Sequence, residues 1–216
     1  MTRADAGIWP VLFDGLVTTV GVSLTALLLG APLALAIAAA RRGGGVPKGC
    51  AALYVSFWRG TPILVQLLIV FYLLPFLGLD LQPVAAAILA LALNTAAFQS
   101  EIYRAGLQAV PKGEREAAAM LGLSAPQTFL RVEAPQALRT MLPALIGEMQ
   151  ALVKNSSLVS VIAVTDLTRR AQQVAASTFR PLDAYTSALL LYVIVGALLA
   201  GAGIFVEKRL KGRPAR

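Results

Sequence analysis

The chain has 216 residues, of which 57% are hydrophobic and 14% charged, and its formal net charge is +8. This apolar content excludes an ordinary soluble fold and indicates an all-α membrane protein. The sequence contains no His and a single cysteine, Cys50, which excludes imidazole metal sites, imidazole-based catalysis and an intramolecular disulfide. We therefore expect this chain to carry no catalytic residue and no metal site.

Five apolar runs are long enough to cross a membrane as helices. The first, residues 15–40, has no charged side chain. At about 1.5 Å per residue it reaches about 39 Å, which exceeds the hydrocarbon thickness of about 30 Å. It is too long for the hydrophobic region of a signal peptide and ends at Arg41 and Arg42 rather than at a cleavage site with small residues, so we interpret it as a retained span. The other four runs are residues 53–77, 83–100, 141–165 and 184–206.

The second run contains a helix-breaking sequence. Gly60, Thr61 and Pro62 predict that this helix kinks or restarts, and interrupted membrane helices often border transport sites. Gln66, just beyond the break, is a candidate lining residue of a substrate pathway. The alternative is a kink that contacts no ligand.

The longest polar connection, residues 103–140, is unusually organised for a loop and predicts two short helices. The first follows Pro111 and ends before Gly122, which permits a tight turn that a β-carbon would resist. Ala117, Met120 and Leu121 share one face of this helix.

The second short helix of the connection is predicted to run from Ser124 to about Pro135. Ser124 and Gln127 have the spacing of a capping box, in which a hydroxyl accepts one backbone N–H and an amide reaches back to another. Such a helix pair with a small apolar face suggests a docking element for another protein. The alternative is an amphipathic pair that rests on the bilayer surface.

Polar residues also lie inside the predicted spans, where they are costly. Counted from the span ends at about 1.5 Å per residue, Asn94 and Lys154 each lie about 17 Å deep. Lys154 begins the most polar cluster of any span, and Glu148 shares a helical face with Asn155. These residues are candidates for a pathway. Alternatively, Lys154 snorkels, pairs with Glu148 on a neighbouring subunit, or lies nearer an interface because the helix breaks at Asn155.

The distribution of Lys and Arg predicts the orientation of the chain. One alternating set of segments holds thirteen of them and the other set four, and the positive-inside rule places the first set in the cytoplasm. We expect the N-terminus outside and the C-terminus in the cytoplasm. No repeat or linker divides residues 1–216, which predicts one transmembrane domain. The thirteen are Arg41, Arg42, Lys48, Arg104, Lys112, Arg115, Arg131, Arg139, Lys208, Arg209, Lys211, Arg213 and Arg216; the four are Arg3, Arg169, Arg170 and Arg180.

The polar connection resembles the EAA loop of the permease subunits of ATP-binding-cassette importers. The resemblance rests on Glu116-Ala117-Ala118, three residues, Gly122, nine residues, and Val132-Glu133-Ala134-Pro135. Val132 is a mild departure from the usual Ile, and Ala134 a clearer departure from the usual Leu. Further segments are similar to the polar amino-acid permeases of that class: 59–62, 101–106, 110–113, 135–139, 142–143 and 154–158. The similarity spans nearly the whole chain.

This resemblance implies the type I importer permease fold, with five transmembrane helices, in the inner membrane of a bacterium. It implies a second permease subunit, the same chain or a related one, a cytoplasmic ATPase dimer and an external solute-binding protein that delivers a polar amino acid. The residues expected to couple to the ATPase are Glu116, Ala117, Ala118, Leu121, Gly122 and Pro135. Because an amino acid carries a carboxylate and an ammonium, a Lys and a Glu suit its pathway, whose candidate residues are Gln66, Asn94, Glu148, Lys154, Asn155 and Ser156.

The chain itself lacks the G-x-x-x-x-G-K-[ST] loop that cradles nucleotide phosphates, and residues 43–45 have no such continuation. We therefore expect no enzymatic activity in this chain and no cofactor, with ATP and Mg bound by the partner ATPase. Competing hypotheses are a secondary transporter or channel that uses no ATP, and a membrane scaffold without a transported solute. Five spans without an internal repeat and the elaborate connection argue against the first, and the cluster around Lys154 argues against the second.

Overall fold

The computed structural model describes residues 7–210, and every regular element in this range is a helix. Three helices are long and apolar enough to cross a membrane: α1 (Ile8–Arg42), α4 (Pro83–Gln108) and α9 (Pro181–Leu210). Two bent helix pairs raise this number to five if each pair forms one span. Four of the Lys and Arg residues that predict the orientation lie outside the described residues: Arg3, Lys211, Arg213 and Arg216.

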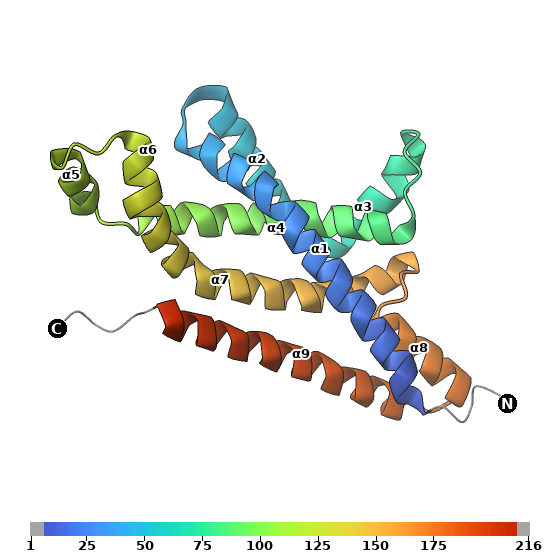
Figure 1. The fold of residues 1–216 in the computed structure, drawn as a ribbon. Helices are drawn as coiled ribbons and strands as arrows, with labels where there is room; N and C mark the ends of the chain where they lie inside the picture. Colours follow the sequence, from blue (N-terminus) through green and yellow to red (C-terminus); the bar gives the residue numbers. More distant parts are fainter. Residues whose placement is uncertain (1–6, 211–216) are drawn as a thin grey trace.

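The long helices pack as a layer crossed by the first helix. Figure 1 shows α4, α7 (Ala134–Asn155) and α9 side by side, with α1 running diagonally across them. The main core lies where α1 packs along α4, and the small side chains of Ala26, Ala87 and Ala90, all at most 2% exposed, lie in it among Val, Leu and Ile residues. Small side chains allow helix backbones to approach closely, which is how membrane helices gain packing energy.

The predicted interruption of the second apolar run is confirmed. The run forms two helices, α2 (Gly45–Gly60) and α3 (Ile63–Phe76), whose axes differ by 109°. Between them Thr61 is extended, with φ −114° and ψ 151°. Pro62 explains this conformation, because its ring disfavours the helical region for the preceding residue and it has no N–H to continue the helix.

The polar connection forms a short helix α5 (Lys112–Met120), as predicted, and then α6 (Ala125–Thr128). The prediction that the second helix ends near Pro135 is wrong. A π-helical turn, η1 (Phe129–Glu133), joins α6 directly to α7, so the chain is helical from Ala125 to Asn155. A wider turn at this point relieves the clash between a proline ring and the carbonyl four residues earlier, which would otherwise break the helix.

The fourth apolar run ends differently from the predicted single helix. α7 stops at Asn155, and a 3₁₀ segment, η2 (Ser156–Ile162), leads to Ala163, whose φ is 64°. A further helix, α8 (Leu167–Thr178), then follows at an angle of 52°. Sequence analysis did not predict α8. Its signal was Asp166, whose carboxylate accepts hydrogen bonds from the N–H groups of Thr168 and Arg169 as an N-cap.

α8 packs closely against the first turns of α1. The Leu167 N–H donates to Thr19 Oγ1 at 3.0 Å, and Arg170 forms an ion pair with Asp14. Gly15 lies at the closest point, where a β-carbon would come within 2.8 Å of the Asp166 carbonyl oxygen and the Leu167 Cα. Only glycine fits there without a movement of the backbone.

We predict that Gly15→Ala lowers the free energy of unfolding by about 1–3 kcal/mol, because the added methyl group overpacks the α1–α8 contact. The matched control is Gly21→Ala in the same helix, where a β-carbon meets nothing within 4 Å. The control is expected to gain about 0.5–1 kcal/mol of helix propensity. Thermal unfolding of the detergent-purified protein measures both, and equal melting temperatures for the two variants would contradict the close packing.

Candidate functional site

The turn between α5 and α6 is built around Gly122. Its φ is +77°, in the left-handed region that glycine adopts without strain. The N–H of Gly122 donates to the Ala119 carbonyl at 3.0 Å, and the N–H of Leu123 donates to the Ala118 carbonyl at 3.1 Å. These bonds close the end of α5 as in a glycine C-cap. The tight turn predicted at Gly122 is confirmed.

The start of α6 is held by the predicted capping box. The Ser124 N–H donates to Gln127 Oε1 at 2.9 Å, and the Ser124 side chain accepts from the backbone of Gln127. With Gly122 on one side and this cap on the other, the turn has a defined geometry rather than that of a flexible loop.

The short helices expose an apolar face. Met120 is 89% exposed and Leu121 80%, and Ala117 on the same face is also exposed, as are Glu116 and Pro135. Ala118 differs from these residues, because it is only 3% exposed and faces its own chain. The expected coupling residues therefore divide into an exposed group and a buried residue that supports it.

One buried carboxylate ties this loop to the helices behind it. Glu133 in η1 has a side chain only 11% exposed, and its oxygens pair with Arg115 of α5 at 3.1 Å and Arg42 of α1 at 3.6 Å. Arg115 also donates through Nη2 to the Leu107 carbonyl of α4 at 2.9 Å. Two ion pairs and one charge-assisted hydrogen bond, that of Arg115 with the Leu107 carbonyl, thus connect α5, η1, α1 and α4.

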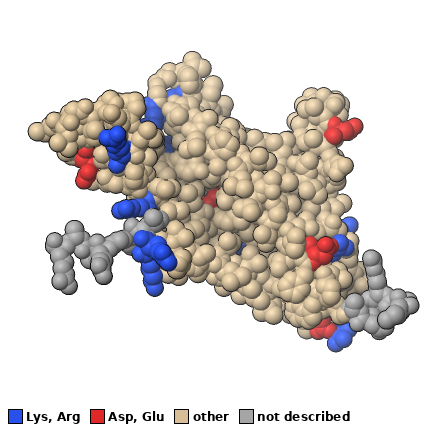
Figure 2. Space-filling model, in the orientation of Figure 1, with Lys and Arg blue, Asp and Glu red and all other residues tan. Residues whose placement is uncertain are grey.

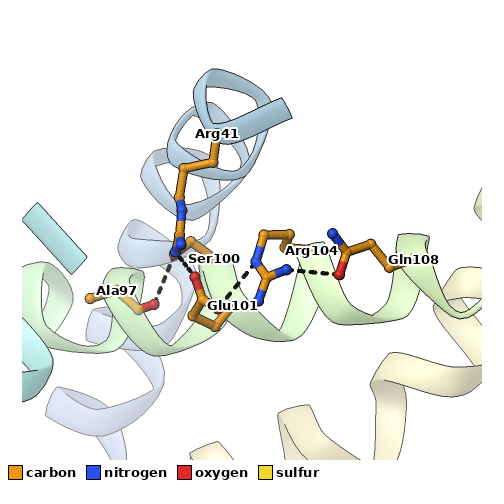
Figure 3. Close-up of polar contacts among 6 residues, drawn as sticks. All are labelled: Arg41, Ala97, Ser100, Glu101, Arg104 and Gln108. Carbon is orange, nitrogen blue, oxygen red and sulfur yellow. Dashed lines mark hydrogen bonds and ion pairs between the residues drawn. The ribbon is translucent and has the colours of Figure 1, made fainter. Parts of the chain in front are cut away.

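A second carboxylate joins α1 to α4. Figure 3 shows Arg41 and Arg104 on either side of Glu101. Glu101 pairs with Arg104, three residues later in α4, at 2.7 Å, and also with Arg41 of α1. Arg104 in turn donates to Gln108 at 2.7 Å. The contacts that brace this region were not predicted, because the partners of Arg41, Arg42, Arg115 and Glu133 lie far away in the chain.

Two of the predicted pathway residues, Gln66 and Asn94, lie together at the break between α2 and α3. The Trp58 carbonyl would bond to the N–H of residue 62 in a continuous helix, but Pro62 has none. Gln66 Nε2 and Asn94 Nδ2 instead donate to this carbonyl at 2.9 and 3.1 Å. Asn94 also donates to Gln66 Oε1 at 2.8 Å. Both side chains are at most 5% exposed. In this structure their role is to donate hydrogen bonds to the carbonyl that the helix break leaves without a backbone partner.

A buried polar seam continues along α4. Thr95 Oγ1 donates to Glu148 Oε1 of α7 at 2.7 Å, and Gln99 Nε2 donates to the Leu27 carbonyl of α1 at 3.2 Å. Sequence analysis placed Glu148 in a pathway but missed Thr95 and Gln99. Their spacing of four residues on one helix face was the available signal.

The predicted cluster at the end of α7 is split between different faces. Lys154 is exposed and lines a groove of about 510 Å³ between α7 and α9, together with Gln150 and Tyr192. Glu148 instead bonds to α4, and no ion pair joins it to Lys154 among the described residues.

The two polar residues that follow Lys154 also differ in their surroundings. Ser156 is fully buried and donates to the Val153 carbonyl at 2.8 Å, whereas Asn155 is half-buried at the end of α7. Between residues 7 and 210 there is no cluster of three or more Cys, Asp and Glu side chains that could hold a metal ion.

We predict that Gln66→Leu destabilises the protein by about 1–3 kcal/mol, because the Trp58 carbonyl loses a donor in a region without water. The double variant with Asn94→Leu should cost less than the sum of the single variants, since both residues serve the same carbonyl. Gln82→Leu, an exposed site without a side-chain cap bond, is the matched control. Strict additivity in thermal unfolding would show that the two amides act independently.

The sequence matches a known protein family and several characterised relatives. Residues 26–211 match the family described as "Binding-protein-dependent transport system inner membrane component". The L-cystine transport system permease protein TcyB of Bacillus subtilis is 39% identical over 94% of this chain and 87% of the relative. The arginine permease protein ArtQ of the same organism is 36% identical, over 94% and 93%. The glutamine permease protein GlnP of Escherichia coli is 35% identical, over 96% of each.

Solved structures agree with the sequence relatives. A crystal structure of an amino acid ABC transporter with histidines superposes with a TM-score of 0.87 at 35% identity, covering 93% of this chain and 94% of that chain. The MetNI methionine transporter, at 19% identity and a TM-score of 0.78, shares the fold. These relatives are permease subunits of importers whose ATPase is a separate subunit, in agreement with the expected absence of enzymatic activity here. The chain therefore belongs to the family of inner membrane components of binding-protein-dependent transport systems, and it has the type I permease fold of amino-acid importers.

Proposed function

We propose that this chain lines the translocation pathway of an importer for polar amino acids and receives its driving force through the loop of residues 103–140. The observation that carries the proposal is an exposed apolar face, with Met120 and Leu121 at 89% and 80% exposure, on a loop that is otherwise firmly braced. A braced loop with a bare apolar face is suited to transmit the movement of a partner protein.

The partner proposed for this face is a cytoplasmic ATPase, one copy on each permease of a dimer. Glu116, Ala117, Leu121 and Pro135 are exposed and available for contact, while Gly122 sets the direction of the turn. Ala118 supports the face from behind. The ATPase binds ATP and Mg. ATP binding favours one arrangement of the ATPase, and the two loops pass this preference to the permease, since ATPase and permease each change between two linked conformations.

The transported solute in this proposal is a polar amino acid delivered by an external binding protein. Support comes from the relatives, which are named for cystine, arginine and glutamine transport. Within the membrane, the groove beside Lys154 and the buried Thr95–Glu148 contact supply an ammonium and a carboxylate on different faces of α7. Asn94 and Gln66, with Asn155 and Ser156, are proposed to border this pathway by keeping its two helix breaks in place.

The proposed topology has five spans, with the N-terminus outside and the C-terminus in the cytoplasm. In Figure 2, Lys and Arg predominate over acidic residues at the end of the molecule that carries α5, α6 and the last turn of α9, whereas neither sign predominates at the opposite end. The positive-inside rule favours the first end as cytoplasmic. The two spans beyond the three long helices are the bent pair α2–α3 and the pair of α7 with α8.

We predict that Leu121→Asp reduces recovery of the ATPase by about tenfold, as expected for a central residue of a protein interface. The measurement is quantitative mass spectrometry of everything that copurifies with the tagged chain from its own membranes. The matched control is Val46→Asp, an equally exposed residue of α2 at 78%.

Thermal unfolding of both variants establishes that the fold is intact. An ATPase that copurifies equally with Leu121→Asp and with the wild type would remove the loop face from the interface. If no ATPase copurified with the wild type, while a control transporter stayed assembled, the proposal of an ATP-driven permease would fail.

The orientation predicts which side of the membrane each cysteine faces. Cys50 is exposed near the start of α2 and should react with a membrane-impermeant maleimide only in inside-out vesicles. Leu79→Cys, introduced together with Cys50→Ser in the exposed connection between α3 and α4, should react only in intact spheroplasts. The reverse pattern for the two cysteines would invert the proposed topology.

A further inference from the structure

A strongly basic cavity lies where α1, α4 and α5 meet. Its volume is about 380 Å³, and it is bordered by the last turn of α1, the last turns of α4 and the first turn of α5. Among the described residues that line it, none is acidic and five are cationic: Arg41, Arg42, Arg104, Lys112 and Arg115. Nothing in the proposed coupling or transport functions uses this space.

The nearby carboxylates do not neutralise the cavity. Glu101 pairs with both Arg41 and Arg104, and Glu133 pairs with both Arg42 and Arg115. In the part of the chain that the structure describes, Lys112 forms no ion pair. Five positive side chains against two carboxylates leave an excess of three positive charges around one small space.

This excess is poorly screened. Side-chain exposure is 23% for Arg41, 30% for Arg104 and 36% for Arg115, so these guanidinium groups are only partly in contact with bulk water. Like charges repel more strongly where the effective dielectric constant is below that of water. An anion in the cavity would relieve this repulsion and accept the remaining N–H groups.

Arginine-rich lining also selects the kind of anion. The planar guanidinium offers pairs of parallel N–H donors that match the oxygens of a phosphate, and Lys112 adds a mobile point charge. Inorganic phosphate brings up to two charges and four oxygens to share among several donors, and the phosphodiester of a lipid headgroup brings one charge on two free oxygens of a tetrahedral group.

We infer that this cavity binds a phosphate group with a net negative charge. Two sources share this chemistry: the headgroup of an anionic phospholipid and soluble phosphate. The ends of α1 and α4 border the cytoplasmic leaflet if the proposed orientation is correct, and that leaflet supplies the first source. Binding of a phosphate group itself does not rest on the proposed function.

A bound phosphate would strengthen the contact between the loop and the spans. Arg115 and Lys112 belong to α5, whereas Arg41 and Arg42 belong to α1, so one anion between them draws the two elements together. The residues exposed for a protein partner, Met120 and Leu121, are not among those that line the cavity. The site is therefore separate from the docking face and is suited to a small anion rather than to a protein surface.

The test is thermal unfolding of the full chain, purified in detergent and washed free of copurified lipid, at constant ionic strength. Three probes are titrated separately: inorganic phosphate, short-chain phosphatidylglycerol, and zwitterionic short-chain phosphatidylcholine as a reference. The variant is Lys112→Gln, which removes a lining charge without leaving a carboxylate unpaired. Its matched control is Lys48→Gln, an exposed cation of α2 outside the cavity.

For the wild type we expect stabilisation by at least one of the two anionic probes. In Lys112→Gln, the apparent affinity of the protein for that probe should be about fivefold weaker, as expected for the loss of one partly screened charge. Lys48→Gln should match the wild type. Stabilisation by phosphatidylglycerol alone identifies the leaflet as the source, and stabilisation by inorganic phosphate identifies a soluble anion.

Two results would overturn the inference. One is the absence of stabilisation by either anionic probe beyond that of phosphatidylcholine. The other is equal affinity of the wild type, Lys112→Gln and Lys48→Gln, which would show only nonspecific attraction to a basic surface. Arg42→Gln, which leaves Glu133 paired with Arg115, provides a second lining variant if Lys112→Gln fails to fold.

Discussion

Every backbone carbonyl inside a membrane needs a partner within the protein, since the hydrocarbon core holds no water. At one of its several prolines the chain loses such a partner and compensates for the loss with side chains. Pro62 deprives the Trp58 carbonyl of its helical donor, and the amides of Gln66 and Asn94 take its place. Since Asn94 belongs to α4, which also packs against α1 and α7, the repair of one helix break joins the bent pair α2–α3 to the centre of the molecule. A polar side chain in a span can thus be required by the backbone rather than by a ligand.

Features with local causes were accessible from the sequence. Pro62 dictates an extended Thr61, Gly122 dictates a left-handed turn, and Ser124 with Gln127 dictates a helix start, because each depends on residues within four positions. The five apolar runs likewise follow from composition. The predicted break at Asn155 also belongs to this group, as an alternative that the end of α7 confirms.

Features with distant causes were not accessible. The pairing of Arg41 with Glu101 depends on how α1 crosses α4, which no local pattern encodes. Lys154 and Glu148 looked like two halves of one polar cluster, yet six residues turn a helix far enough to place them on different faces. Pro135 looked like a helix end, but a π-helical turn joins α6 to α7 just before it, and Pro135 lies in the first turn of α7. In each case the deciding interaction is a tertiary contact or a change in helix type.

The continuity of α6, η1 and α7 has a mechanical consequence. From Ala125 to Asn155 the chain is helical without interruption, which amounts to about 45 Å of helix at about 1.5 Å per residue, and Figure 1 shows that it bends between α6 and α7. A continuous helix held near one end behaves as a bent lever: a displacement of its α6 end turns the far end about its contacts with α4 and α9. The η1 turn is the one place in this segment where the α-helical hydrogen-bond pattern changes. Its stiffness would set how much of an applied stroke reaches the middle of the membrane.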